Sequence, residues 1–416
     1  MPRSENPPQM ETTSERIERR TNELWDRLRE RGAAPDFRDD RTLRSFSLGE
    51  VAEILGVSGS YLRQLSIDGL GPTPELGTAG RRSYTLRQIN ELRAYLASAR
   101  PKEALKFCPR RREGEKLQII SVASGFASTT TSFYLAQGLA LQGYRVLAID
   151  LDPKGSLSKM FGYYFPTILR PGRPTSMYGA LSYDDDRVSM HSVIQSTHFD
   201  GLYLVPGTFE LEIFERESTK RFHNEHLGHP DASIRMVDAL KEVEQGYDVV
   251  VIHCGLGRSF LTAGAYEAAT GVLMTVRPHW PEIASMALSL HRFSYFVSLI
   301  EKAGRSVNYD FTKYLVTRHD PRDVSQQEAV ALLRDWLGDD LLTATVWESD
   351  AIRQAWMKNR SLYELSAGEV GRSAYEQAME TLNSTNAEVM DILSKVWGRP
   401  PMYVSRASRT AGKASS

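Results

Sequence analysis

KLQIISVASGFASTTTSFYLAQGLALQGYRVLAIDLDPKGSLSKMFG, residues 116–162, is the stretch that decides the fold. Its first apolar run, Leu117–Val122, predicts a buried strand, and the apolar residues of Thr129–Leu141 recur at helical spacing. Gly143 stands where that helix would end, and the run Arg145–Ile149 predicts a second buried strand. Strand, loop, helix and strand form one βαβ unit, which requires parallel strands and favours a right-handed crossover.

This unit also predicts the position of a site. In sheets with parallel strands, ligands bind at the carboxyl ends of the strands. The loop 123–128 and the carboxylates of Asp150 and Asp152 follow two such ends, so we expect them to face one crevice. Predicted strands and helices alternate over the rest of the domain. The expected fold is therefore α/β, with a doubly wound, mostly parallel sheet.

Two motifs of this unit resemble the nucleotide-binding core of the ParA-type partition ATPases. In that family the second strand ends L-I-D-x-D-P-Q, and residues 147–158, LAIDLDPKGSLS, match this pattern. The family's preceding loop, a deviant Walker A motif, reads K-G-G-x-G-K-T-T. This chain keeps Gly125, Thr129 and Thr130 of that motif. The positions of its two lysines and of two glycines hold Ala123, Ser128, Ser124 and Ala127.

A third motif of the family is altered as well. Residues 247–255, YDVVVIHCG, match its later strand, but His253 stands at the Walker B aspartate, which helps to orient magnesium. A phosphate loop needs glycines that turn backbone amides inward and a lysine that meets the β and γ phosphates. A hydrogen bond to a charged group contributes about 1.5 to 3 kcal/mol, so losing both lysines would cost roughly 3 to 6 kcal/mol.

The resemblance implies ATP and magnesium as cofactors, whereas the altered motifs predict that this chain binds ATP poorly or not at all and hydrolyses none. We therefore expect a pseudo-ATPase with no catalytic and no metal-binding residue. The residues expected to form the degenerate cofactor site are Gly125, Ser128, Thr129, Thr130 and Asp152. Asp152 would orient water in an active relative, and here it is expected to form a turn at the end of the strand. The loop before the helix could still hold a small anion.

A second informative stretch is FSLGEVAEILGVSGSYLRQLSIDG, residues 46–69. It predicts two short helices with a reversal at Gly56, and a glycine- and proline-rich loop, two arginines and another helix follow. This order resembles the winged helix-turn-helix of MerR-type regulators and of RepA partition proteins, whose second helix enters the major groove. The residues expected to contact DNA are Ser58, Ser60, Tyr61, Arg63, Gln64, Arg81 and Arg82. The alternative is that Tyr61 and Leu65 belong to the core and that one arginine caps a turn.

Composition divides the chain into five parts. They are an arm with one helix and a linker (1–45), the winged helix-turn-helix domain (46–100), a basic linker (101–116), the nucleotide-binding-fold domain (117–400) and a disordered tail (401–416). The arm helix, from Thr12 or Thr13 to about Arg31, either mediates association or packs on its own domain. The consecutive arginines of the basic linker, Arg110 to Arg112, either contact phosphate or are solvated.

The composition, with 41% hydrophobic and 25% charged residues among 416, is that of an ordinary water-soluble protein. It contains no run of 18 apolar residues and no N-terminal signal sequence, so we expect a cytoplasmic protein without a membrane partner. Cys108 and Cys254 lack metal-ligand spacing and are expected to be reduced. Residues 1–116 hold 22 Lys and Arg against 18 Asp and Glu, which favours a DNA-facing N-terminal part.

Functions of different class remain open at this point. The resemblance, from about Arg44 to Arg399, implies a homodimeric partition protein that binds plasmid or nucleoid DNA, represses its own operon and meets a centromere-binding partner of the ParB or RepB type. The lost charges favour a DNA-binding family member that keeps the ATPase fold as a scaffold. The alternatives are an active partition ATPase with an unusual loop, and a nucleotide-independent regulator that forms mixed dimers with an intact relative.

Overall fold

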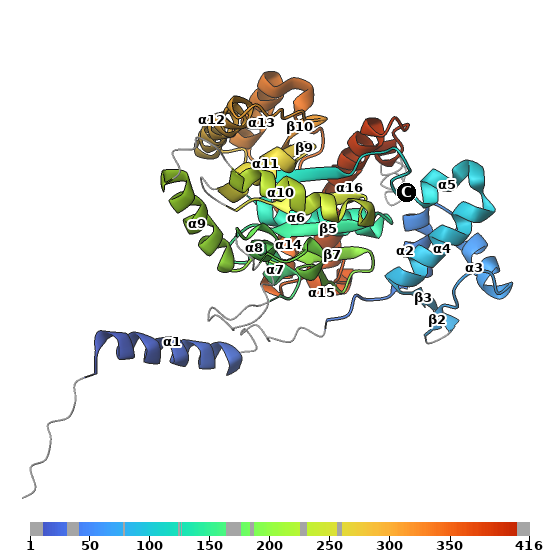
Figure 1. Cartoon of the computed structure of the whole chain (residues 1–416). Helices are drawn as coiled ribbons and strands as arrows, with labels where there is room; N and C mark the ends of the chain where they lie inside the picture. Colours follow the sequence, from blue (N-terminus) through green and yellow to red (C-terminus); the bar gives the residue numbers. More distant parts are fainter. Residues whose placement is uncertain are drawn as a thin grey trace, which may run out of the picture. The chain divides into compact units, whose positions relative to one another are not determined.

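The computed structural model describes residues 11–30, 41–77, 80–123, 125, 127–163, 176–183, 187–224, 231–255 and 260–405 (Figure 1). The chain forms two compact units, one up to Asp40 and one from Arg41 onward. The first unit contains α1 (Thr13–Glu30), which confirms the predicted arm helix. Two of its apolar residues, Ile17 and Leu24, are exposed. The linker predicted for residues 32–40 lies outside the described residues.

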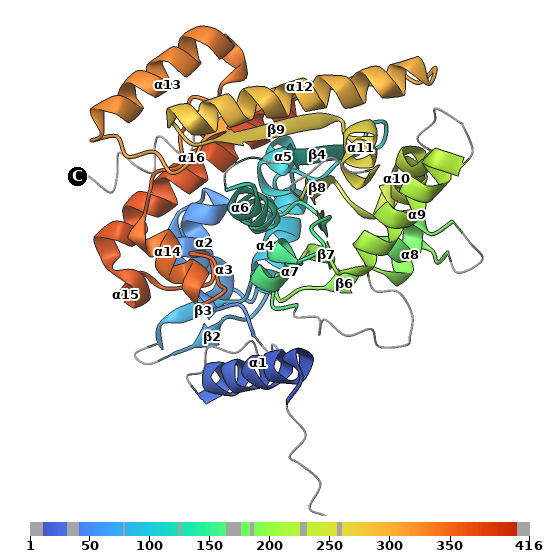
Figure 2. The same cartoon turned by 90° about the vertical axis from the view of Figure 1, so that its left-hand side faces the viewer.

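A seven-stranded sheet forms the centre of the second unit (Figures 1 and 2). In spatial order its strands are β10 (Phe311–Val316), β9 (Gly271–Val276), β4 (Gln118–Ala123), β8 (Val249–His253), β5 (Val146–Asp150), β7 (Leu202–Val205) and β6 (Gln195–Ser196). All neighbouring strands are parallel except β6 and β7. The predicted α/β fold with a mostly parallel sheet is therefore confirmed. The strands of this sheet are covered by helices on both faces, so their side chains on both faces are buried. This is why the strands are continuous apolar runs in the sequence.

Helices cover both faces of this sheet (Figure 2). On one face, Val146 and Ala148 of β5 join the core that includes α6 (Ser128–Leu141) and α16 (Arg372–Val396). On the other face, Leu147 and Ile149 join the core of α8 (Met177–Leu181), α9 (Glu210–Asn224), α10 (Asp231–Glu242) and α11 (Phe260–Ala268). The further helices of this domain are α7 (Ser156–Met160), α12 (Trp280–Lys302), α13 (Val324–Leu337), α14 (Asp350–Met357) and α15 (Ala367–Val370).

Residues 46–107 form a separate small module of the second unit. Its elements are β1 (Phe46–Ser47), α2 (Leu48–Leu55), α3 (Gly59–Ile67), β2 (Glu75–Leu76), β3 (Arg82–Tyr84), α4 (Leu86–Ala99) and α5 (Ala104–Phe107). The strands pair antiparallel in the order β1, β3, β2. Gly56 ends α2 at φ 63°, a left-handed conformation that glycine adopts without strain, and this lets α3 start three residues later. The element order is the one expected from the sequence.

A buried arginine fixes this module onto the sheet domain. Arg93 of α4 is 2% exposed and donates to the Phe107 carbonyl at 3.1 Å and to the Leu141 carbonyl, at the end of α6, at 2.8 Å. Gly143, predicted to end this helix, has φ 98°, and a Cβ there would lie 2.8 Å from Cδ of Arg93. The chain can thus approach the arginine closely only because residue 143 has no side chain.

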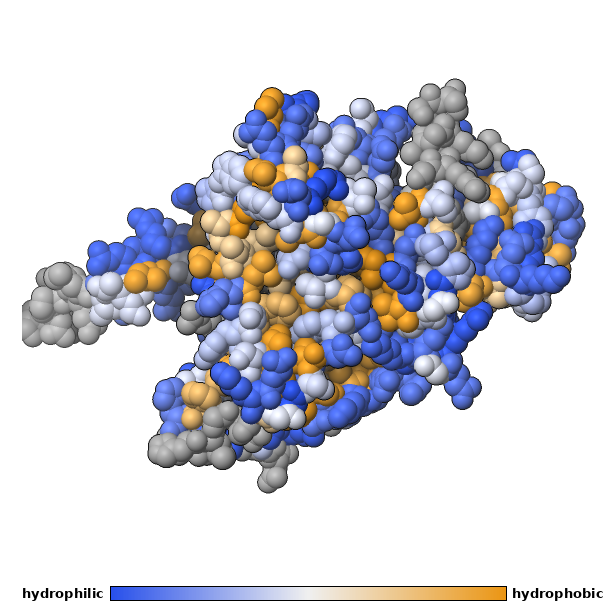
Figure 3. Space-filling view, turned by 90° about the horizontal axis from the view of Figure 1, so that it is seen from above, coloured by the Kyte–Doolittle hydropathy of each residue, from blue (hydrophilic) through white to orange (hydrophobic). Residues whose placement is uncertain are grey.

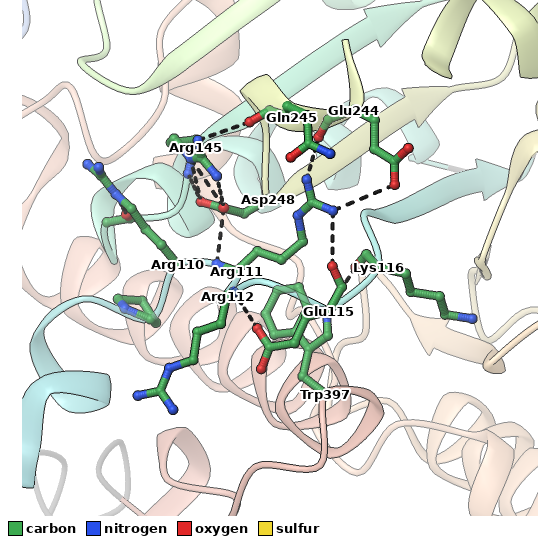
Figure 4. Close-up of polar contacts among 12 residues, drawn as sticks. Arg110, Arg111, Arg112, Glu115, Lys116, Arg145, Glu244, Gln245, Asp248 and Trp397 are labelled. Atoms are coloured by element: carbon green, nitrogen blue, oxygen red, sulfur yellow. Dashed lines mark hydrogen bonds and ion pairs between the residues drawn. The ribbon is translucent and has the colours of Figure 1, made fainter. Parts of the chain in front are cut away.

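The basic linker after the module is held by hydrogen bonds (Figure 4). The Arg111 amide donates to Asp248 Oδ1 at 3.1 Å, and the Arg111 guanidinium donates to the Glu115 carbonyl at 3.0 Å. The Arg145 guanidinium pairs with the same Asp248 carboxylate at 2.6 Å. With 8% of its side chain exposed, Arg111 is neither solvated nor available to phosphate, in contrast to both possibilities considered for it.

The ordered chain extends beyond residue 400, where the sequence placed the start of the tail. Asp391 of α16 accepts hydrogen bonds from the amides of Met402, Tyr403 and Val404. The Tyr403 hydroxyl lies 2.9 Å from that of Tyr144, and its side chain is buried. Residues 406–416 lie outside the described residues.

Helix α12 is the one described helix that is long and apolar enough to cross a membrane, by length and composition only. Its apolar window has a mean hydropathy of 1.3 and is 17% buried. Ile283, Phe293 and Phe296 pack onto the core of β9 and β10, whereas Leu288 and Tyr295 are exposed. Figure 3 shows apolar side chains among hydrophilic ones on the side that is uppermost in Figure 1. A single such helix is weak evidence for a membrane span, because helices that pack on a core pass the same test.

Substitution of Arg93 tests how the module is attached. Arg93→Met removes two charged hydrogen bonds and leaves the two carbonyls buried, so we expect the free energy of unfolding to fall by about 2 to 4 kcal/mol. Urea denaturation followed by circular dichroism measures this change. Arg87→Ala is the control, because Arg87 lies on the same helix with 79% of its side chain exposed, and it should cost less than about 1 kcal/mol. Equal losses in the two variants would contradict the role given to Arg93.

Candidate functional site

Three strand ends and one helix N-terminus converge at the carboxyl edge of the sheet. In the sheet β8 lies between β4 and β5, so that Ala123, His253 and Asp150 end neighbouring strands. His253 and Asp150 are paired directly in the strand register. Helix α6 begins at Ser128 after the loop that follows β4. The crevice expected from the sequence therefore brings the altered loop, the histidine and the first aspartate together.

A chain of hydrogen bonds joins these elements. His253 Nδ1 lies 3.0 Å from Asp150 Oδ1, and His253 Nε2 lies 3.1 Å from the Thr129 hydroxyl. Asp150 is fully buried and His253 is 3% exposed. Because a carboxylate oxygen accepts, Nδ1 carries the hydrogen, and in a neutral imidazole Nε2 then accepts from the threonine hydroxyl. The histidine therefore binds the hydroxyl of Thr129, one of the residues predicted for the degenerate cofactor site.

The other side of Asp150 is enclosed by α7 and the end of β7. Asp150 Oδ2 accepts from the Ser158 amide at 2.8 Å and from the Ser158 hydroxyl at 2.7 Å, and Oδ1 also accepts from the Asp152 amide at 3.1 Å. Gly207 closes this side, because a Cβ there would lie 2.9 Å from the Asp150 carboxyl carbon. The Gly207 amide donates to the Ser158 hydroxyl at 2.8 Å. The carboxylate is thus surrounded by protein donors.

The loop before α6 keeps one feature of a phosphate loop and lacks its charge. Ala127, at the position of the third family glycine, has φ 68° and ψ 19°, a left-handed conformation that costs a non-glycine residue about 1 to 2 kcal/mol. Gly125 packs against β9, where a Cβ would lie 2.3 Å from the Thr275 carbonyl oxygen. Ser128, at the position of the Walker lysine, is buried. Ser124 and Phe126 lie outside the described residues.

The other predicted cofactor residues lie around this loop. Thr130 is half-buried in the first turn of α6. Asp152 accepts from the Lys154 amide at 3.0 Å and from the Ser156 hydroxyl. These contacts are those of a turn at the strand end, the role that the sequence favoured for Asp152. Burial raises the pKa of the neighbouring Cys254 thiol to about 12, so this cysteine is protonated and unreactive at neutral pH.

The predicted DNA-contacting residues fall into two groups. Ser60, Arg63 and Arg81 are exposed, and their side chains form no hydrogen bond or ion pair with other described residues. The remaining four have contacts inside the module. The Ser58 hydroxyl accepts from the Tyr61 amide at 3.2 Å, the Tyr61 ring lies 4.5 Å from the Arg100 guanidinium, Gln64 donates to Asp68 at 2.7 Å and Arg82 donates to Ser66 at 3.2 Å. The contact of Arg82 brings β3 beside α3. Of the two residues that the alternative assigns to the core, Leu65 is buried and Tyr61 packs partly buried against the core.

The sequence did not predict that His253 bonds both Thr129 and Asp150. From the sequence, His253 was interpreted only as the loss of the Walker B aspartate, and no bonding partner was predicted for it. A signal was nevertheless present, since both His253 and Asp150 end apolar strands of a parallel sheet and such ends meet at one edge. What the sequence lacked was the strand order that makes β5 and β8 neighbours.

Comparisons with known proteins agree with this architecture. Residues 115–311 match a family model described as an AAA domain. A protein named as a replication protein A from Sinorhizobium fredii is 40% identical over 363 residues, which cover 86% of this chain and 88% of that protein. A protein of the same name from Rhizobium rhizogenes is 36% identical over 364 residues, covering 87% and 89%. A solved structure named Partition Protein has a similar fold, with a TM-score of 0.63 at 16% identity over 92% of this chain and 98% of that one.

The strained residue of the loop can be tested by removing its side chain. Ala127→Gly relieves a positive φ, so we expect it to leave the free energy of unfolding unchanged or to raise it by up to about 1 kcal/mol. Ala331→Gly, at an exposed position inside α13, is the control and should cost about 0.5 to 1 kcal/mol. Thermal unfolding of both variants measures the difference. A loss at Ala127 as large as that at Ala331 would show that residue 127 is not held in the left-handed conformation.

Proposed function

Because this chain belongs to the RepA family of ParA-type partition proteins, we propose that it is a DNA-binding partition protein whose nucleotide site has been lost. Its biochemical activity in this proposal is DNA binding, and it binds ATP poorly or not at all and hydrolyses none. It represses its own operon and acts in segregation as a homodimer, in the cytoplasm on plasmid or nucleoid DNA. Its protein partner is a centromere-binding protein of the ParB or RepB type.

The observation that carries this proposal is the hydrogen bond between His253 and Thr129. An ATP site of this fold needs a lysine for the triphosphate and a carboxylate that orients magnesium. Here both lysine positions are neutral, and the imidazole has taken the threonine hydroxyl. No cation replaces the lysines at these two positions, which Ala123 and Ser128 occupy. The site therefore lacks the attraction that a nucleotide with several negative charges requires.

The small N-terminal module supports DNA binding as the activity. Arg63 projects from α3 as an exposed cation, and Arg81 precedes β3, the strand that contacts the end of α3. In a winged helix-turn-helix these positions belong to the recognition helix and the wing. Arg93 holds the module against the sheet domain through its hydrogen bond to the Leu141 carbonyl, and its second bond, to the Phe107 carbonyl, lies within the module. Because the module is already fixed on the sheet domain, DNA binding loses little conformational entropy in ordering it. This favours DNA binding without a nucleotide.

Two observations favour the alternative of an active partition ATPase. Lys154 is exposed two residues after Asp152, and Ala127 keeps the left-handed conformation of a phosphate loop. The Lys154 ammonium could approach the phosphates in place of the missing lysines. The third candidate, a regulator that forms mixed dimers with an intact relative, shares the DNA-binding module and differs in requiring that relative.

Calorimetry with ATP or ADP in the presence of magnesium tests the loss of the nucleotide site. We expect no binding up to about millimolar nucleotide, because the missing charged contacts weaken affinity by about two to four decades. Lys154→Ala is the matched variant and should likewise show no binding. A micromolar affinity in the natural protein that Lys154→Ala abolishes would overturn the proposal and support an active ATPase.

Fluorescence anisotropy on the DNA upstream of the chain's own gene tests the DNA-binding activity. We expect the same Kd with and without ATP, and a loss of about tenfold or more in Arg63→Ala, since one base contact contributes about 1 to 3 kcal/mol. Arg322→Ala is the charge-matched control, because Arg322 is exposed on the sheet domain and paired with Asp320. It should change the Kd by less than about twofold. An affinity that appears only with ATP, or equal losses in both variants, would count against the proposal.

A further inference from the structure

The imidazole of His253 stands at the position of the family's Walker B aspartate and lies between Thr129 and Asp150. Both of its ring nitrogens are satisfied, one by Asp150 at 3.0 Å and one by Thr129 at 3.1 Å. The ring is 3% exposed, so neither bond competes with bulk water. A buried polar group that is fully bonded stabilises one arrangement of its neighbours, because any other arrangement leaves a donor or acceptor unpaired.

The donor atoms at this edge do not fit magnesium. Magnesium requires six oxygen ligands in octahedral geometry, with carboxylates binding it directly or through its waters. An ionised carboxylate has about four lone-pair positions, and Asp150 accepts hydrogen bonds from four protein donors. These donors are the amides of Asp152 and Ser158, the Ser158 hydroxyl and the His253 ring. Asp152 accepts from the Lys154 amide and the Ser156 hydroxyl, so it keeps unused lone pairs, and the Thr129 hydroxyl is bound to His253. Of the two carboxylates, Asp152 alone could still bind a cation, and one carboxylate does not make an octahedral site.

We propose that His253 replaces magnesium as the group that holds the N-terminus of α6 to the sheet. Thr129, His253 and Asp150 form a metal-independent latch, in which α6, β8 and β5 each contribute one residue. The inference rests on the proposed loss of the nucleotide site and adds that this site has become a permanent structural joint. The changes at positions 128 and 253 are then related. His253 Nε2 accepts a hydrogen bond from the Thr129 hydroxyl. A joint that binds no phosphate needs no lysine at position 128.

The latch has a consequence at the other end of α6. This helix has 14 residues and is about 21 Å long at a rise of about 1.5 Å per residue. Its N-terminal turn is held by His253, and its last carbonyl, that of Leu141, accepts from Arg93 of the DNA-binding module. Helix α6 is therefore fixed at both ends by the protein itself. The module keeps its place on the sheet domain with neither magnesium nor nucleotide present.

Thermal unfolding of the full-length protein in EDTA and in about 10 mM magnesium chloride, at equal ionic strength, tests the latch. The natural protein should show the same Tm in both, within about 1 °C. His253→Asp breaks the latch and sets a second carboxylate against buried Asp150, so its Tm in EDTA should be lower by about 5 °C or more. Magnesium should then raise the Tm of this variant by a few degrees, since a cation that binds two facing carboxylates stabilises the folded state.

His253→Asn is the matched control, since it removes the imidazole without adding a charge. Its Tm should fall as well, but magnesium should not raise it. A natural protein stabilised by magnesium would overturn the proposal, and so would a His253→Asp variant as stable as the natural one in EDTA. Neither readout involves DNA or ATP, so a failure here is separate from a failure of the proposed DNA binding.

Nuclear magnetic resonance of the natural protein labelled with 15N-histidine gives a second test that needs no folded His253→Asp variant. The protein has nine histidines, and comparison with His253→Asn assigns the signal of residue 253. We expect the Nδ1–H tautomer, with a slowly exchanging ring proton, and no change on addition of magnesium. A ring hydrogen on Nε2, a rapidly exchanging proton or a shift with magnesium would contradict the latch.

Discussion

A buried imidazole needs a partner at each ring nitrogen, and this requirement organises the carboxyl edge of the sheet. Asp150 fixes which nitrogen of His253 carries the hydrogen, and the other nitrogen is then an acceptor directed at Thr129. One side chain thereby joins two neighbouring strands to the start of α6. A similar requirement applies to the buried carboxylate of Asp150, whose oxygens accept hydrogen bonds from protein donors. An unpaired acceptor at full burial would cost about 1 to 3 kcal/mol or more.

Helix α6 connects this edge to the N-terminal module. It is buried around almost its whole circumference, so it cannot shift without disturbing the core that it shares with α16. Arg93 reaches its C-terminal carbonyl, and Gly143 leaves room for that arginine. In the function proposed here, these contacts replace a nucleotide as the means of placing the DNA-binding module. The linker with Arg111 and Asp248 adds a second attachment of the same kind.

The fold was largely predictable, because burial on both faces of a parallel sheet leaves continuous apolar runs that can be recognised in one dimension. The strands 117–122 and 145–149 were each predicted to within about one residue of the observed bounds. Other parts were not predictable. Arg111 looked like a solvated or phosphate-binding charge, and Tyr403 was assigned to a disordered tail, because their partners at Asp248 and Tyr144 lie more than a hundred residues away.

By itself the sequence determined the α/β class, the order of the elements and the absence of lysines from the loop, since periodicity and motif positions are local properties of the chain. It also determined which residues reach the carboxyl edge of the sheet. Only the tertiary structure decided that His253 lies between Asp150 and Thr129, because that contact depends on the strand order β4, β8, β5. In the sequence, His253 is only the loss of an aspartate. In the structure it forms two hydrogen bonds, with Asp150 and Thr129, which are 103 and 124 residues away along the chain.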